Sequence, residues 1–293
     1  MQLSDNDVNP LQRWRASKPA LDAFLSRYYL FTGDYDKCIQ FANTALNSTN
    51  TKLVDFNTLE AGTPMVFPNP TVTLNYSILN NYAASKFLFW EEFYFTRFVN
   101  NSNQWNIPSP DLISLYDTQN DMRYKHFMIE NSNRRFGVLS PATFRYCVFN
   151  DGRYLAEGPS IAEVLLNKAE AAARKGDVNT AMSAVNLLRI KRMKIIADLS
   201  ASSPAEAVVK VLQERRRELP FAYRWLDIRR FSVNNDPSDD VTVTRTFFKV
   251  NNGAVDLNAT ETYNLPVNSR RYMVPINAGE IANSRGQIIQ NTY

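Results

Sequence analysis

The sequence predicts a mostly α-helical protein, built from tetratricopeptide-like helical hairpins with a long irregular insertion and a small β-hairpin. Three observations support this fold class. Two segments share the residue spacing of one helical repeat, and the chain between them is rich in proline and aromatic residues. In a stretch near the end, residue types alternate along the chain as they do in a strand. With 293 residues, the chain can bury a sizeable core.

Both helical hairpins are predicted from residues placed around a glycine. The first is expected over residues 11–47 with its turn at Gly33-Asp34, and the second within residues 160–231 with its turn at Gly176-Asp177. Short side chains let antiparallel helices approach closely, so both hairpins are interpreted as scaffold. The residues that fit the repeat are Leu25, Ser26, Tyr29, Tyr35, Cys38, Ala42 and Ala45 in the first hairpin, and Ala169, Ala172, Ala181, Val185 and Leu188 in the second.

Residues 48–159 form the predicted irregular insertion. They hold 20 of the 36 aromatic residues of the chain, which exceeds their share of its length. A long irregular segment between regular elements is more often functional than decorative, so we expect the ligand-binding residues here. Asp121 and Arg123 within it are expected to form a structural ion pair.

The last part, residues 232–293, is predicted to hold the β-hairpin and a C-terminal tail. Residues Val241 to Val250 alternate as a strand does, and Asn251-Asn252-Gly253 follows as a turn signal. Gln290 and Asn291 in the tail are suited to bonding backbone groups.

Residues 214–231, ERRRELPFAYRWLDIRRF, are charged but backed by apolar residues, as two short helices broken at Leu219-Pro220 would be. The acids stand among the arginines at spacings that predict pairing inside the fold rather than a basic surface. This stretch resembles the signature of the SusD/RagB family, the cell-surface glycan-binding lipoproteins of Bacteroidetes. The matching residues are Glu214, Arg215, Glu218, Leu219, Phe221, Arg224, Trp225, Asp227, Ile228, Arg229 and Arg230.

The stretch departs from the family pattern at Ala222-Tyr223, where many members have Glu-Gly. A second resemblance lies at the C-terminus, PINAGEIANSRGQIIQNTY. The residues that fit there are Pro275, Ile276, Glu280, Ile281, Asn283, Gln290, Asn291 and Tyr293, whereas Asn277 and Thr292 depart from the pattern.

The resemblance implies one SusD-like domain over residues 1–293 that lacks its N-terminal part. It implies a protein of the outer membrane and cell surface, held by a lipid anchor absent from this chain. It further implies that the protein binds oligosaccharide or polysaccharide and delivers it to a SusC-like TonB-dependent transporter, without catalysis and without a cofactor.

Composition argues against several other classes. The net charge is +4 and the basic residues are interleaved with acids, whereas a nucleic-acid surface needs clustered basic residues. Cys38 and Cys147 lack metal or redox spacing and are expected to be buried thiols. His126 is the one histidine, and its apolar neighbours favour a half-buried packing role. Metal and phosphate-loop motifs are lacking, so no metal site is expected.

Sugar binding needs a flat aromatic ring against the apolar face of a pyranose, with polar side chains around it. The segment 100–108, NNSNQWNIP, has this composition, so we predict Trp105 as the platform with Asn103, Gln104 and Asn106 beside it. Tyr76 and Tyr82, which lie among asparagines, are further candidates. An alternative reading is that Trp105 anchors its loop to the core.

Two other functions stay open at this point. A helical-repeat adaptor that binds a peptide would display polar and aromatic side chains on a concave repeat face. A glycoside hydrolase needs two carboxyl groups about 5 to 10 Å apart, one of them with a raised pKa. The most conspicuous acids stand beside arginines, which lower the pKa of a carboxyl group, so catalysis is the weaker hypothesis.

Overall fold

The computed structural model describes residues 5–58, 65–67, 72–74, 91–100, 106–130, 144–146, 154–221 and 223–292. The chain divides into two compact units, Met1–Arg224 and Trp225–Tyr293. The single-domain organisation stays a prediction. Among the described residues, no helix combines the length and the apolar character needed to cross a membrane.

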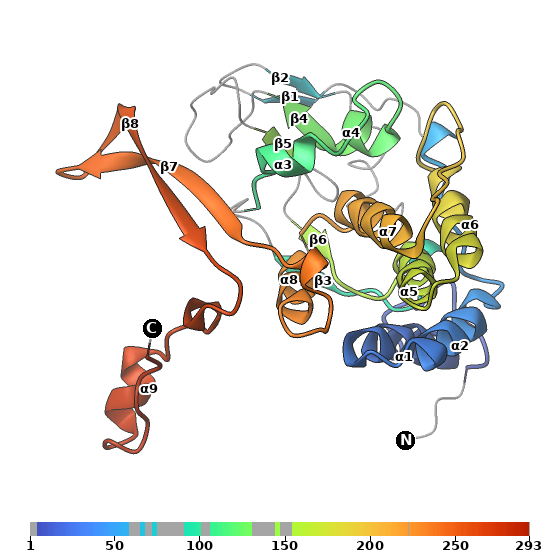
Figure 1. Ribbon diagram of the computed structural model, residues 1–293, viewed down its shortest axis with the longest axis horizontal. Helices are drawn as coiled ribbons and strands as arrows, with labels where there is room; N and C mark the ends of the chain where they lie inside the picture. The colour runs from blue at the N-terminus through green and yellow to red at the C-terminus, as the bar shows by residue number, and fades with distance from the viewer. Residues whose placement is uncertain are drawn as a thin grey trace. The chain divides into compact units, whose positions relative to one another are not determined.

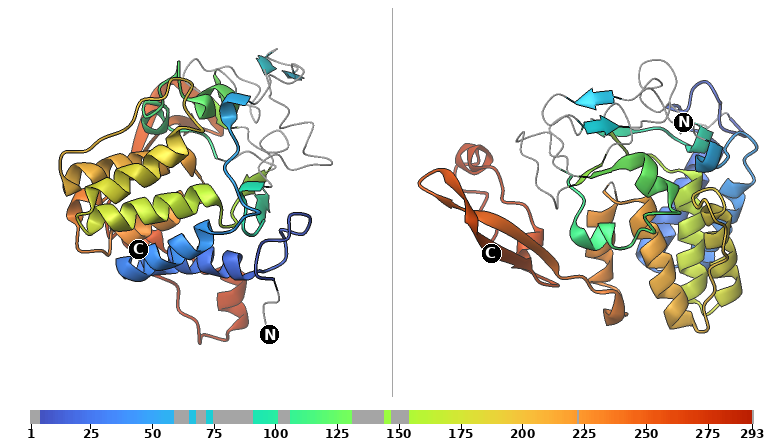
Figure 2. Two further views of the ribbon diagram at one scale, coloured as in Figure 1. Left: turned by 90° about the vertical axis from the view of Figure 1, so that its right-hand side faces the viewer. Right: turned by 90° about the horizontal axis from the view of Figure 1, so that it is seen from above.

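Two helical hairpins form the frame of the first unit, as predicted. Helices α1 (Lys18–Thr32) and α2 (Tyr35–Leu46) make the first, and α5 (Ile161–Arg174) and α6 (Val178–Arg189) make the second. Helix α5 packs against α1 and α2 on one side and against α7 (Pro204–Glu218) on the other. The five helices stack side by side (Figures 1 and 2).

The turns of both hairpins have the local chemistry that the sequence predicts. Gly33 and Gly176 adopt left-handed φ angles of 78° and 88°, which a glycine tolerates without strain. Asp34 and Asp177 then cap the second helix, each accepting a hydrogen bond from the backbone N–H three residues on. The helices therefore begin and end where local signals place them.

Small side chains let the helices approach, and one polar residue links them. Alanines fill the shared core of α5 and α6, where Ala169, Ala172 and Ala181 are fully buried. The buried Asn167 of α5 donates to the Ser26 hydroxyl of α1 at 3.1 Å and accepts from Arg215 Nη1 of α7 at 2.8 Å. The Sγ of Cys38, a buried thiol as predicted, donates to the Asn167 carbonyl.

The insertion contributes short elements to the first unit. They are the 3₁₀ helix η1 (Phe56–Thr58), helices α3 (Pro110–Ile113) and α4 (Met122–Phe127), and strands β1 (Met65–Phe67), β2 (Val72–Leu74), β3 (Phe98–Asn100), β4 (Met128–Glu130), β5 (Phe144–Tyr146) and β6 (Tyr154–Ala156). The strands pair antiparallel as β1 with β2, β3 with β6 and β4 with β5. His126 of α4 is half-buried against Phe56, as the sequence predicts.

The second unit holds the predicted β-hairpin. Strands β7 (Val243–Asn251) and β8 (Ala254–Leu265) are joined at Asn252 and Gly253, both with positive φ, which is the type I′ geometry that this pair of residues favours. The unit also contains most of α8 (Arg224–Phe231), with η4 (Pro237–Asp239), η5 (Arg270–Tyr272) and α9 (Ala278–Asn283). In the tail, Gln290 bonds the N–H and the carbonyl of Ile276, and Asn291 donates to the Val274 carbonyl, as predicted.

Replacing Gly158 by Ala is expected to lower the free energy of unfolding by about 1–3 kcal/mol. The added Cβ would lie 1.7 Å from the carbonyl oxygen of Phe95, a backbone atom that cannot rotate away. Gly33→Ala is the matched control, because nothing lies within 4 Å of its added Cβ and only its left-handed φ opposes the change. Urea unfolding measures both variants, and equal losses would contradict this explanation.

Candidate functional site

The predicted sugar-binding residues fall mostly outside the described residues. Trp105, Asn103, Gln104, Tyr76 and Tyr82 all do, so their role stays a prediction. Asn106 is described: it is half-buried, in the connection from β3 to α3. Three residues later, Ser109 caps α3 by accepting from the N–H of Leu112 at 3.3 Å.

The described part of the insertion is fastened to the helical frame at three places. The first holds residues 50–56 and 91–94 together through Arg13, which precedes α1. Arg13 donates to the carbonyls of Asn50 and Phe93, and the N–H of Val54 donates to the Glu92 carboxylate at 2.8 Å. Residues 50–56 and 91–94, which flank residues 59–90 in the sequence, are therefore held together.

The second place joins β3 and β6 to helices α1 and α5. Arg27 of α1 makes two hydrogen bonds to the carboxylate of Glu163 on α5, at 2.5 and 2.6 Å, and a third to the Tyr223 hydroxyl. The Tyr223 hydroxyl in turn donates to the carbonyls of Glu157 and Gly158, directly after β6. Tyr223 is where the sequence departs from the family pattern, and this departure completes the buried cluster.

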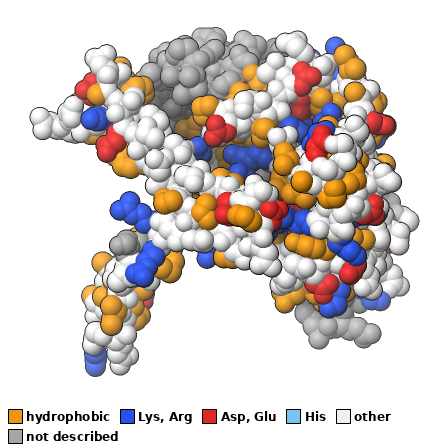
Figure 3. Space-filling view, viewed as in Figure 1, with side chains coloured by type: hydrophobic (Ala, Val, Ile, Leu, Met, Phe, Trp, Pro, Cys, Tyr) orange, Lys and Arg blue, Asp and Glu red, His pale blue; other side chains and the backbone are white. Residues whose placement is uncertain are grey.

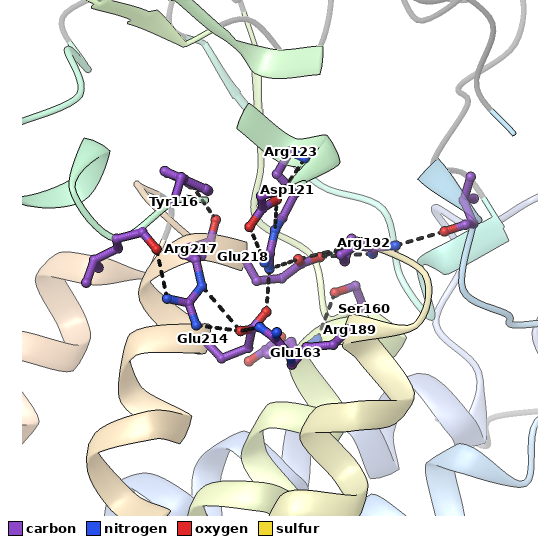
Figure 4. A network of polar contacts seen from close by, with 12 residues as sticks. Tyr116, Asp121, Arg123, Ser160, Glu163, Arg189, Arg192, Glu214, Arg217 and Glu218 are labelled. Carbon is purple, nitrogen blue, oxygen red and sulfur yellow. Dashed lines mark hydrogen bonds and ion pairs between the residues drawn. The ribbon is translucent and has the colours of Figure 1, made fainter. Parts of the chain in front are cut away.

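The third place joins residues 106–130 to α7. The Tyr116 hydroxyl donates to the Arg217 carbonyl at 2.7 Å, and Arg217 Nη1 donates to the Leu115 carbonyl at 3.1 Å. Arg123 contacts Asp121, Glu214 and Glu218 at 2.7–2.9 Å, and its side chain is 3% exposed. The predicted Asp121–Arg123 ion pair is therefore confirmed, within a larger network (Figure 4).

The two glutamates of the signature are the centre of this network. They stand one helical turn apart on α7, so both carboxylates face the same side. Glu214 pairs with Arg123, Arg189 and Arg217, and Glu218 pairs with Arg123 and Arg192. Pairing of the signature acids is thus confirmed, but most of their partners lie outside residues 214–231.

Burial acts to raise the pKa of Glu92, Glu214 and Glu218, and the arginines oppose it. For Glu214, attraction to Arg123, Arg217 and Arg189 outweighs burial, and the pKa falls well below its ordinary value. The pKa of Glu218 is also lowered, through Arg192 and Arg123. Glu92 shares Arg192 with Glu218, so burial dominates and the pKa of Glu92 is raised.

This arrangement does not suit a glycosidase acid pair. Glu92 has the raised pKa that a general acid needs, but it is 5% exposed and both of its carboxylate oxygens accept from Arg192. The Glu218 side chain is 7% exposed and bonded to Arg123 and Arg192. A substrate cannot reach these carboxylates without breaking the network, which is structural.

The remaining signature residues also have structural contacts. Asp227 pairs with Arg230 at 3.0 Å, and the Trp225 ring stacks on Tyr272 with centroids 5.1 Å apart. Within the described ranges, no three His, Cys, Asp or Glu side chains gather as a metal site would require. On the face drawn in Figure 3, acidic and basic side chains adjoin one another instead of forming one basic area.

Several residues that fasten the insertion escaped the sequence analysis. Arg192 and Glu92 stand 100 positions apart, and Arg27 and Glu163 stand 136 apart, so no local spacing connects them. The one sequence signal was their type, because an arginine or glutamate in an apolar or helix-packing segment needs a buried partner.

Comparisons with known proteins are consistent with this architecture. Residues 161–293 match the model of the SusD family. Comparison with curated proteins gave no match. A SusD-like protein from Bacteroides fragilis has the same fold, with 19% identity and a TM-score of 0.61 over 98% of this chain and 67% of that one.

Two further solved structures share the fold. A surface glycan-binding protein A from Bacteroides uniformis is 15% identical, with a TM-score of 0.61 over 97% of this chain and 62% of that one. A SusD-like carbohydrate binding protein from Bacteroides vulgatus is 17% identical, with a TM-score of 0.58 over 94% of this chain and 60% of that one. At such identities the likeness shows the fold alone, and this chain spans 60–67% of the length of the three structures.

Glu214 and Glu218 of α7 lie within the residues that the family model matches. The solved structures share the fold in which these two glutamates form ion pairs. The chain is therefore similar to the SusD family, whose model matches residues 161–293.

Proposed function

We propose that the protein binds oligosaccharide or polysaccharide at the cell surface and delivers it to a SusC-like TonB-dependent transporter in the outer membrane. In this proposal a lipid anchor holds the protein at the membrane, and the protein performs no catalysis. Two of the structures that share its fold are named as glycan-binding or carbohydrate binding proteins, which supports the sugar as ligand.

The observation that carries the proposal is that the first unit combines a packed helical frame with an irregular insertion held against it. The helical hairpins are held by alanine packing, and the described parts of the aromatic-rich insertion are fastened to the frame by buried hydrogen bonds and ion pairs at three places. A rigid frame that fixes the ends of variable segments is a common arrangement for recognition. Aromatic and amide side chains of residues 48–159 are the proposed contacts with sugar.

Weak binding is expected at each site, since sugar hydroxyls must give up bound water for every hydrogen bond gained. Many copies on one cell surface would together retain a long polysaccharide through multivalency. Incubation with a panel of polysaccharides, scored for retention and for release of reducing ends, tests the proposal. Retention without cleavage supports it, whereas cleavage would indicate a glycoside hydrolase.

A peptide-binding adaptor is the second candidate, and one observation favours it. Leu21, Phe24 and Tyr28 lie on one face of α1 and are 44–50% exposed, as an unpaired helical-repeat face would be. Such an adaptor would retain no polysaccharide on any member of the panel.

Replacing Trp105 by Ala is expected to weaken polysaccharide binding about tenfold, because the variant loses the flat ring proposed to cover a pyranose. The matched control is Trp14→Ala, which removes an indole that is 56% exposed and lies outside the insertion. Affinity electrophoresis in gels that contain the retained polysaccharide measures both. Equal affinity of the Trp105 variant and the wild type would remove Trp105 from the site.

A further inference from the structure

Arg192 joins three segments that lie far apart in the sequence. Its guanidinium donates to the Val54 carbonyl at 2.8 Å, to both carboxylate oxygens of Glu92 at 2.8 and 3.1 Å, and to Glu218 of α7 at 2.9 Å. The Arg192 side chain is fully buried. It is followed by the connection to α7, and the Arg192 carbonyl accepts from the N–H of Met122 at the start of α4.

Val54 and Phe56 precede residues 59–90 in the sequence, and Glu92 follows them. We call these three residues the neck of the insertion. Arg192 fills the neck: Val54 and Glu92 accept its hydrogen bonds, and the Phe56 ring lies under its guanidinium, 3.8 Å from ring centroid to Cζ. The Val54 N–H also donates to Glu92. The Arg192 side chain therefore holds Val54 and Glu92 together, although 37 residues separate them in the sequence.

The contact with Glu218 connects the neck to the frame. Glu218 also binds Arg123, so the neck and residues 106–130 are held by the same carboxylate on the same helix. Only a planar guanidinium presents donors in several directions at fixed angles, and a lysine in its place could not serve all of these acceptors. Without Arg192, Glu92 and Glu218 would be two buried carboxyl groups deprived of the cation that they share.

We propose that Arg192 is a positioning residue for sugar binding: it fixes the neck of the insertion against α7. The proposal rests on the proposed function for its binding readout. Its structural part, that Arg192 holds the neck, is independent of the ligand.

The test compares Arg192→Met with Arg192→Lys and a matched control, Glu170→Gln. Glu170 is also fully buried and is paired with an arginine of its own helix, Arg174 of α5. Each variant is examined by circular dichroism and urea unfolding, by amide hydrogen exchange in residues 50–56 and 91–94, and by affinity for the polysaccharide that the wild type retains.

Arg192→Met is expected to keep the helical signal, to exchange faster at the neck than in α1 and α5, and to bind about tenfold more weakly. Arg192→Lys is expected to show a smaller change in the same direction, and it carries the test if the Met variant does not fold. Glu170→Gln is expected to lose stability while its neck exchange and its affinity stay at the wild-type level.

Unchanged neck exchange and affinity in both Arg192 variants would overturn the inference, and so would an equal loss of affinity in Glu170→Gln. Faster exchange spread evenly over the helices would show a general structural role and overturn it as well. A wild type that retains no polysaccharide would refute the proposed function, while neck exchange would still decide whether Arg192 holds the insertion.

Discussion

Glu214→Gln is expected to lower the free energy of unfolding by roughly 3–5 kcal/mol, the cost of removing one partner from a buried ion network. The Glu214 side chain is fully buried and contacts three arginines, Arg123, Arg189 and Arg217. An amide keeps the shape of the carboxylate but leaves their positive charges without its compensation. The loss should appear as a lower urea midpoint, while the dependence of the free energy of unfolding on urea concentration stays unchanged.

Acid provides a second check on the same variant. The folded pKa of Glu214 lies below its ordinary value of 4.5, so its stabilising contribution is present above that value and is lost as the pH falls below it. The gap in stability between the wild type and Glu214→Gln should therefore be widest near neutral pH and narrow below about 4.5.

Glu206→Gln is the matched control for this prediction. Glu206 lies on the same helix and pairs with Lys210, but the pair is half-exposed and screened by solvent, so a much smaller change is expected. A loss as large in Glu206→Gln as in Glu214→Gln would mean that helix propensity, and not the buried network, accounts for the effect.

Arg27→Met is expected to cost about 3–5 kcal/mol as well, because it leaves the buried Glu163 carboxylate without its cation. It also removes the donor to the Tyr223 hydroxyl and the guanidinium that lies 4.2 Å from the Tyr223 ring centroid. The double variant Arg27→Met with Glu163→Met removes both charges, so most of the lost stability should return. Urea unfolding of the wild type, Arg27→Met, Glu163→Met and the double variant completes the cycle. A double variant no more stable than Arg27→Met would contradict the ion-pair explanation.

The helical frame was predictable because its signals are local. Gly33-Asp34 and Gly176-Asp177 combine a residue that tolerates positive φ with a helix cap, and both turns lie where the sequence places them. Asn252-Gly253 marks the β-hairpin in the same way. Each of these features depends on neighbours within a few residues.

The fastening of the insertion was not predictable, because it depends on pairs distant in the sequence. Arg123 was assigned to Asp121, its neighbour, yet it also binds Glu214 and Glu218 on α7. Arg192 gave no signal beyond its residue type, since its partners Val54 and Glu92 are found only once the chain has folded. The family signature marked the two glutamates of α7, but it did not indicate which segments they hold.

The central claim is that the insertion contacts the polysaccharide while the helical hairpins only support the insertion. Amide hydrogen exchange of the wild-type chain, with and without a retained polysaccharide, tests it most directly. The polysaccharide is expected to slow exchange within residues 48–159 and to leave α1, α2, α5 and α6 unchanged. Slower exchange along the helical hairpins, with none in residues 48–159, would contradict it.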